Sequence, residues 1–211
     1  MKKIVLFALL FAPLTILAQF GVKAGLNFAN VTKASSINNS SKTGFHAGVL
    51  FGSSSQKVLG VRTELLYSKQ GYDYKTSSNT GNVNLDYLMS SNLTCINITK
   101  YLQLQAGFQM AYLLNAKVDS NKVTTGNAQA DKIMDMFNRF DYGFAGGVEI
   151  HPVAGLLIGA RANISLGSLY KDAQNGQMPS FSSVDLKNNV FQLFLGWRFG
   201  QQSSSKKKTT E

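Results

Sequence analysis

The sequence is poor in cysteine, proline and charge. Cys95 is the one cysteine among 211 residues, so no disulfide can form within the chain. Only 3 prolines are present, and charged residues make up 15%, whereas about 25% is usual for a soluble protein. Glycine, by contrast, occurs 19 times. This composition favours many strands joined by tight turns.

Long apolar runs are also missing, except near the N-terminus. Two lysines precede an apolar stretch at residues 4–17, and the small residue Ala18 follows. This is the pattern of a secretory signal, so we expect residues 1–18 to be removed by cleavage after Ala18 or Gln19. No later stretch approaches 18 uninterrupted apolar residues, so the sequence predicts no further membrane-spanning helix.

The formal net charge of +10 raises the question of nucleic acid. The basic residues are scattered, and the one cluster, Lys206–Lys208, lies in a polar tail at 201–211. An exported chain rarely meets nucleic acid, so we expect no such partner and a tail that is simply solvated.

In the rest of the chain, apolar and polar residues alternate with a period of two. In YLQLQAGFQMAYLL (101–114), apolar side chains occupy one parity, whereas the other carries Gln103, Gln105, Gly107 and Gln109. Such alternation predicts a strand with one apolar face. The pattern recurs at 20–28, 44–52, 59–69, 139–151, 156–168 and 189–199.

One further strand is predicted at 84–98, where the alternation is weaker. Its apolar face is assigned to Leu85, Tyr87, Met89, Leu93 and Cys95, and Ser91 interrupts the pattern. The total is eight strands, the smallest usual number for a membrane barrel.

The predicted connections alternate in length. Short ones lie near 53–57, 97–100 and 152–155, and long polar ones near 30–43, 71–82, 117–138 and 168–187. Short periplasmic turns and long extracellular loops are typical of outer-membrane barrels. We therefore predict an all-β fold, an eight-stranded antiparallel up-and-down transmembrane β-barrel spanning residues 19–200, in the outer membrane of a Gram-negative cell.

Aromatic residues support this arrangement, because they fall at both ends of the predicted strands. Two such belts are what the two membrane interfaces favour. The long-loop belt comprises Phe28, Phe45, Tyr67, Tyr87, Tyr112, Phe140 and Tyr142, and the short-turn belt comprises Phe20, Phe51, Trp197 and Phe199.

Two barrel types could carry these strands. A soluble barrel such as a lipocalin encloses its apolar face, whereas a membrane barrel turns that face to lipid. The polar parity is rich in glycine, which would make a poor water-facing surface but suits a crowded interior, so the membrane barrel is favoured. An eight-stranded barrel is just wide enough to be filled by side chains, which disfavours a general diffusion pore.

Charged side chains on the polar parity must then pair inside the barrel, because an isolated buried charge is very costly. With four bases against three acids, near balance is expected. The predicted structural network comprises Lys23, Arg62, Glu64, Gln103, Gln105, Gln109, Asp141, Glu149, Arg161 and Arg198.

Several segments spread over most of the chain match the pattern of a known family in order and spacing. They are 20–31, 44–51, 65–72, 84–88, 101–118, 139–150 and 194–200. In these segments the chain resembles the PorT-like outer-membrane β-barrel proteins. The resemblance implies the fold and the outer membrane, but no reaction. Met89-Ser90-Ser91 departs from the family pattern, which usually continues with Glu, an aliphatic residue and Pro.

No catalytic or metal motif is visible. His46 and His151 fall at opposite rims, too far apart to share a metal or a triad. The acidic pairs Asp73/Asp86 and Asp131/Asp135 could bind a cation, although solvation in loops is the simpler interpretation. A short helix predicted at 128–139 either caps the barrel mouth or presents a partner surface. We therefore expect no enzyme and no cofactor.

The last strand resembles the signal that the barrel-assembly machinery reads, although residues 200–211 follow it. The alternating residues of this signal are Phe191, Leu193, Leu195, Trp197 and Phe199. We expect contacts with membrane lipid, lipopolysaccharide and this machinery, and with an envelope protein through the long loops. A structural or interaction role is predicted. The alternatives are an accessory component of a secretion or envelope-assembly complex and, less favoured, a small-solute transporter or barrel enzyme.

Overall fold

The computed structural model describes residues 19–32, 38–52, 58–75, 80–120, 134, 136–171 and 186–199. These residues form eight strands, close to the predicted positions. The strands are β1 (Gln19–Thr32), β2 (Asn38–Gly52), β3 (Leu59–Lys75), β4 (Thr80–Asn97), β5 (Leu102–Ser120), β6 (Phe140–Ile150), β7 (Leu156–Ser165) and β8 (Lys187–Arg198).

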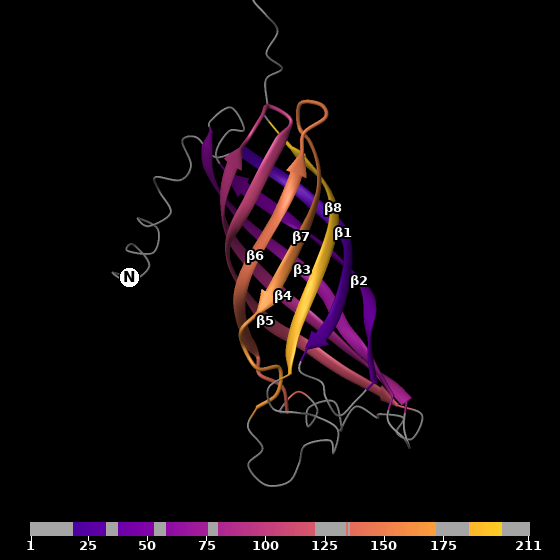
Figure 1. The fold of residues 1–211 in the computed structure, drawn as a ribbon. Coiled ribbons are helices and arrows are strands. Elements are labelled where there is room, and N and C mark those ends of the chain that lie inside the picture. The colour runs from indigo at the N-terminus through magenta and orange to yellow at the C-terminus, as the bar shows by residue number, and fades with distance from the viewer. Residues whose placement is uncertain are drawn as a thin grey trace, which may run out of the picture.

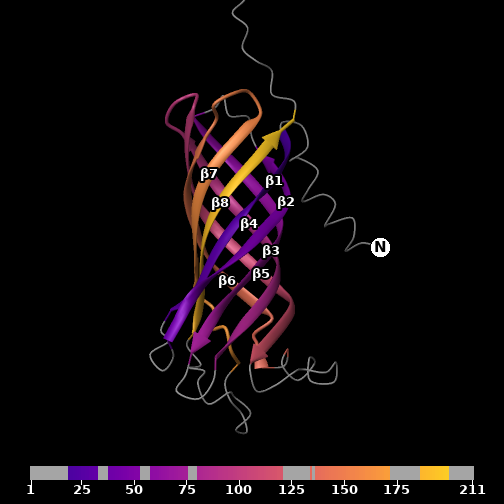
Figure 2. The same cartoon turned by 90° about the vertical axis from the view of Figure 1, so that its right-hand side faces the viewer.

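The strands close into one up-and-down barrel, as Figure 1 shows. Each strand pairs antiparallel with its neighbour in sequence, and β1 pairs with β8 to complete the ring, with Ala24 opposite Leu195. The turns at 98–101 and 151–155 lie at the upper end in Figures 1 and 2, and the strand ends next to the predicted long loops lie at the lower end. The predicted fold class is confirmed.

The predicted faces are confirmed on seven of the eight strands. On β1, for example, Val22 and Leu26 point outward with 41% and 49% of their surface exposed, whereas Lys23 and Asn27 between them are buried. Outward apolar residues and inward polar residues are the pattern of a barrel set in lipid.

The face assigned to β4 was wrong. Leu85, Tyr87, Met89, Leu93 and Cys95 point into the barrel and are buried. Pairing with the neighbouring strands decides this, because Ser91 lies opposite Glu64 of β3 and must share its inward face. The outward face of β4 therefore carries Ser90, Asn92 and Thr94.

The aromatic belts are present without Tyr87. At the short-turn end, Phe20 lies between Phe51 and Phe199, with ring centroids 5.3 and 5.6 Å away. At the other end Phe45 packs beside Tyr67, with centroids 6.1 Å apart. Tyr87 is buried inside the barrel, because it belongs to the inward face of β4.

Two predicted long loops are mostly strand. β3 continues to Lys75 and β4 resumes at Thr80, so the hairpin extends through much of 71–82. β2 likewise begins at Asn38, within the predicted loop 30–43. In the β3 and β4 extensions, apolar residues alternate toward the interior while the outer face is polar, as in a soluble sheet. The β2 extension at 38–43 contains no apolar residue. Apolar lipid-facing positions therefore do not mark any of these extensions in the sequence.

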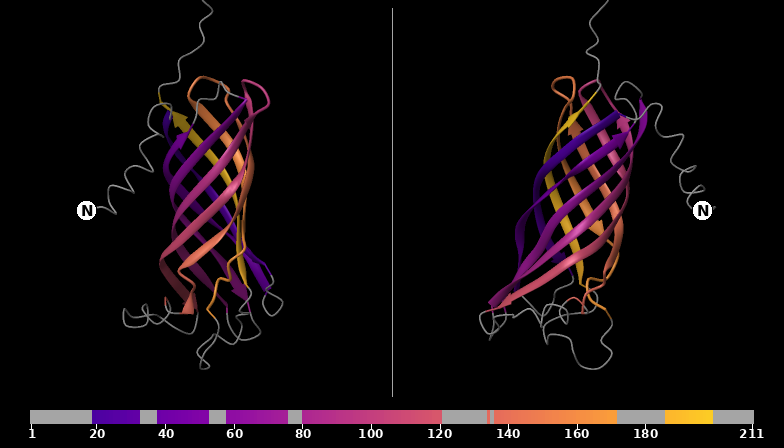
Figure 3. Two further views of the ribbon diagram at one scale, coloured as in Figure 1. Left: turned by 90° about the vertical axis from the view of Figure 1, so that its left-hand side faces the viewer. Right: turned by 180° about the vertical axis from the view of Figure 1, so that it is seen from behind.

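The extensions make the barrel wall uneven. β3, β4 and β5 have 17, 18 and 19 residues, whereas β6, β7 and β8 have 11, 10 and 12. Figures 1 and 3 show the long strands reaching beyond the others at the long-loop end. We call this extension, residues 38–43, 69–75, 80–86 and 115–120 of β2 to β5, the outer wall.

Three predicted segments lie largely or wholly outside the described residues: the signal at 1–18, the helix at 128–139 and the tail at 201–211. They stay predictions, except that the helix does not reach Arg139, because Phe137 forms a β-bridge with Tyr170. Among the helices of the described part, none has the length and apolarity needed to cross a membrane.

Gly107 marks a place where two strands approach closely. A Cβ atom there would collide with the carbonyl oxygen of Asn92 on β4 and lie 2.9 Å from the Cα of Leu93. A Cβ at Gly146 on β6 would meet only the carbonyl oxygen of Gln105, at 3.8 Å. The two glycines thus differ in the space around them.

We expect Gly107→Ala to lower the free energy of unfolding by about 1–3 kcal/mol, since the backbone of β4 or β5 must shift to admit the methyl group. Gly146→Ala is the matched control and is expected to leave stability nearly unchanged. Urea unfolding in detergent micelles measures both. Equal stability of the two variants would contradict this account.

Candidate functional site in the barrel lumen

Glu64 of β3 is the centre of the first group of buried charges in the lumen. Its carboxylate accepts two hydrogen bonds from Arg161 of β7, at 2.7 and 2.8 Å, and one from Lys23 of β1, at 3.0 Å. All three side chains are buried. The bidentate geometry fits the planar guanidinium, which makes this a strong type of ion pair.

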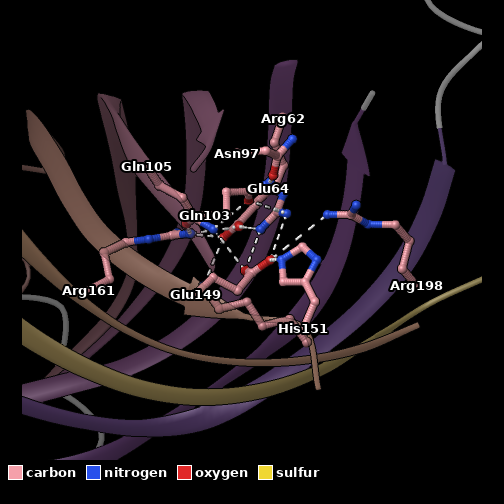
Figure 4. Close-up of polar contacts among 10 residues, drawn as sticks. Arg62, Glu64, Asn97, Gln103, Gln105, Glu149, His151, Arg161 and Arg198 are labelled. Carbon is pink, nitrogen blue, oxygen red and sulfur yellow. Dashed lines mark hydrogen bonds and ion pairs between the residues drawn. The ribbon is translucent and has the colours of Figure 1, made fainter. Parts of the chain in front are cut away.

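Glu149 of β6 is the centre of a second group, nearer the short turns. It accepts two hydrogen bonds from Arg62, at 2.6 and 2.9 Å, and one from Gln105, at 2.8 Å. His151 lies 2.8 Å away through Nε2, and Nη2 of Arg198 lies 4.0 Å away. Figure 4 shows Arg62, His151 and Arg198 converging on this carboxylate.

Two glutamines join the groups into one network (Figure 4). Gln105 donates to Glu149 and to Gln103, and its oxygen accepts a hydrogen bond from Arg161. Gln103 also accepts from Arg62, at 2.9 Å, and donates to Asn97, at 2.7 Å. Eight of the ten predicted network residues therefore lie together in the lumen.

The remaining two, Gln109 and Asp141, do not join the network. Gln109 is buried, but within the described part of the chain its Oε1 accepts no hydrogen bond. Asp141 lies at the long-loop end of β6, where it accepts hydrogen bonds from Ser165 and from the backbone N–H of Tyr142. Without Asp141, which lies on the same parity but at the other end of the barrel, the network has four bases against two acids.

The next layer toward the long loops is neutral and is organised by Asn27. Its amide donates to Ser68, at 2.9 Å, and to the Phe45 and Lys69 carbonyls. Its oxygen meets Nδ1 of His46, at 2.8 Å, and accepts from Gln192, at 3.0 Å. The alternation of the sequence places Asn27 on the inward, polar face. It does not show that Asn27 is the centre of a hydrogen-bond network.

Both histidines serve as hydrogen-bond partners of lumen residues, His46 with Asn27 and His151 with Glu149. They belong to different layers, as their predicted positions near opposite rims imply. Within the described residues, no group of three or more His, Cys, Asp or Glu side chains has the arrangement of a metal site.

An apolar, aromatic layer fills the long-loop end. The hydroxyls of Tyr72 and Tyr170 are 2.5 Å apart, and the ring of Phe137 packs on Tyr170 with centroids 4.7 Å apart. Burial raises the pKa of Tyr170 to about 12. Leu169 and Leu186 add buried apolar surface from the last connection. Segments outside the regular strands therefore pack into the barrel mouth.

The outer wall has the opposite character on its outward side. Lys42 donates to Asn82, at 2.8 Å, and lies 3.8 Å from Asp73. Lys69 lies 3.7 Å from Asp86. The first acidic pair proposed from the sequence thus consists of two carboxylates that each face a lysine. Asp131 and Asp135 lie outside the described residues.

Taken together, the lumen is layered along its axis, with charges toward the short turns, amides in the middle and aromatic rings toward the loops. Large side chains such as Arg161, Arg198, Tyr72 and Tyr87 are fully buried within it. Both carboxylates of the network are engaged by bases.

Known proteins share this architecture. The family model for the outer membrane protein beta-barrel domain matches residues 12–171, more than half of the chain. The chain belongs to this family. It is therefore an integral protein of the outer membrane, with its apolar outward face in lipid.

Among the similar solved structures, Neisserial surface protein A supports the fold. Neisserial surface protein A is 15% identical with a TM-score of 0.50, and the match covers 86% of this chain and 99% of that one. Ail, the attachment invasion locus protein of Yersinia pestis, is 14% identical with a TM-score of 0.47, over 87% and 100%. OprG of Pseudomonas aeruginosa is 13% identical with a TM-score of 0.43, over 87% and 96%. No curated protein matches the chain.

Because the carboxylates are buried in ion pairs, we expect loss of either one to lower the stability of the barrel strongly. Glu64→Gln leaves Arg161 and Lys23 buried without their anion, and we expect the free energy of unfolding to fall by about 3–5 kcal/mol. Glu149→Gln should behave alike because of Arg62.

The control is Asp119→Asn on the outer wall, where the carboxylate is exposed and accepts one hydrogen bond from Asn84. Its effect should stay within about 0.5 kcal/mol. Urea unfolding of the purified barrels in micelles compares the three variants. A Glu64→Gln barrel as stable as the control would refute the structural role of the network.

Proposed function

We propose that this protein is an interaction protein of the outer membrane, with a closed barrel as its anchor and no catalytic activity. The outer wall is the observation that carries the proposal. Its strands extend past the aromatic residues Tyr67 and Tyr112, so this part of the sheet stands outside the lipid. Its outward side is polar, and Lys42 there contacts both Asn82 and Asp73.

A sheet that merely anchors a barrel needs no such extension. By its register, β5 continues eight residues beyond Tyr112, the last residue that it pairs with β6. At a rise of about 3.4 Å per residue and a tilt near 45°, this corresponds to roughly 19 Å above the shorter side. A raised, polar, ordered surface is suited to contact with a protein or with the sugars of lipopolysaccharide.

The layered lumen supports the absence of a wide pore. Three successive layers of buried side chains fill the barrel, and the charged layer is held by ion pairs. We infer that solutes do not diffuse freely through it.

Conductance across planar lipid bilayers measures this property. We expect the purified protein to give no stable open channel at any voltage that the bilayer withstands. Replacement of Tyr72, Tyr87 and Tyr170 by alanine keeps the charged layer and should still leave the barrel closed. Large, steady conductance of the unaltered protein would overturn the proposal of a closed barrel.

The PorT-like segments favour a second, narrower role as an accessory component of a secretion or envelope-assembly complex. This role requires a stoichiometric partner. Photo-crosslinkers at Lys117 and Lys171, which are both exposed, probe the outer wall and the last connection in intact cells. One dominant partner that also co-purifies in mild detergent would support the accessory role, whereas crosslinks to lipopolysaccharide alone would exclude it.

Assembly by the barrel-assembly machinery is proposed to use β8. Phe191, Leu193, Leu195, Trp197 and Phe199 all point outward, and β8 closes the ring against β1.

Deletion of residues 191–199 should abolish outer-membrane assembly, because the closing strand and its aromatic end are both lost. Deletion of residues 201–211 should leave it unchanged. Heat-dependent migration of the protein from membrane fractions scores both variants. Normal assembly of the first deletion would count against a signal in β8.

A further inference from the structure

The lipid-facing surface is interrupted by polar residues at one place. Thr63 of β3 and Ser90, Asn92 and Thr94 of β4 point outward between the two aromatic belts. At outward positions between these belts, the other six strands carry apolar residues or glycine. We call these four residues the polar stripe.

The strand register places the stripe in one continuous patch. Asn92 lies opposite Thr63 on β3 and opposite Phe108 on β5, and Thr94 lies opposite Ala106 on β5. Thr63 donates a hydrogen bond to the Asn92 oxygen, at 2.9 Å. Within the described strands, the Asn92 amide nitrogen has no acceptor, although it faces the hydrocarbon.

An amide nitrogen without an acceptor is costly at the depth of the polar stripe. Asn92 lies five residues before Asn97, the end of β4 at the short turns. With a rise of about 3.3 Å per residue and a tilt near 45°, it stands about 12 Å from that rim, well inside an apolar band of about 25 Å. An amide at this depth has no water to bind, so it needs a protein partner.

We propose that the polar stripe is the contact surface between two copies of this protein within the membrane. Hydroxyl and amide groups each donate and accept hydrogen bonds, and the stripe carries no charge, so it is complementary to itself. Copies in one membrane share one orientation, so a two-fold axis along the membrane normal brings each residue to its mate at the same depth. A different partner would need its own polar group at that depth.

Apolar residues complete the surface. Val61, opposite Thr94, and Phe108, opposite Asn92, flank the stripe with 61% and 62% of their surface exposed. Close packing of these side chains around a hydrogen-bonded centre is what holds protein surfaces together in lipid. This contact is independent of the outer wall, which faces water.

Cysteine crosslinking in native outer membranes tests the proposal. Thr94→Cys is placed in a Cys95→Ser background, which removes the natural thiol of the lumen. Ala162→Cys, a small outward residue on β7, is the matched control. Under a lipid-soluble oxidant, we expect a band of twice the monomer mass at least fivefold stronger for Thr94→Cys than for the control. Equal bands, or adducts only with proteins of other mass, overturn the proposal.

Asn92→Leu supplies the second measurement. Added to Thr94→Cys, it should reduce the dimer band about tenfold, because the central hydrogen bonds are lost while the barrel itself still folds. Heat-dependent migration of the monomer verifies that folding. An unchanged dimer band from a folded Asn92→Leu barrel also overturns the proposal.

Discussion

The narrow interior of an eight-stranded barrel forces its buried charges to satisfy one another. Glu64 reaches Lys23 on β1 and Arg161 on β7, and Glu149 reaches Arg62 on β3. The Glu64–Arg161 pair joins β3 to β7 and the Arg62–Glu149 pair joins β3 to β6 across the lumen, so both form only when the sheet has curled into a barrel. A partly formed sheet leaves the same charges unpaired, and closure of the barrel is therefore cooperative.

The strands themselves could be predicted because lipid imposes a strict rule on them. A residue that faces hydrocarbon must be apolar, so period-two alternation identifies seven strands and their faces. β4 escapes this rule, since its outward face carries Asn92 and Thr94 while Leu93 and Cys95 point inward. Only pairing with β3 and β5 fixes its orientation, and pairing is not visible in the sequence of one strand. Outside the membrane, outward residues need not be apolar. The extensions of β2 to β4 lie there, and for this reason the sequence assigned them to loops.

The interior could be predicted as a set of residues but not as a set of contacts. Inward parity identifies Arg62, Glu149 and Gln105, yet parity carries no information about depth. Depth separates Asp141, near the loops, from Glu149, near the short turns, although both lie on β6. The aromatic layer was missed for a related reason: Tyr72 and Tyr170 lie 98 residues apart, and their contact depends on how a connection folds into the mouth.

The unequal lengths of the strands also bear on the energetics of recognition. A flexible loop must lose conformational freedom when it binds, and that loss subtracts from the affinity. In β3, β4 and β5, hydrogen bonds between strands have already fixed the backbone, and Tyr72 anchors the inner side. A ligand that docks on this surface therefore meets a preorganised receptor. Its backbone already lost its conformational entropy when the barrel folded, so binding does not have to order it.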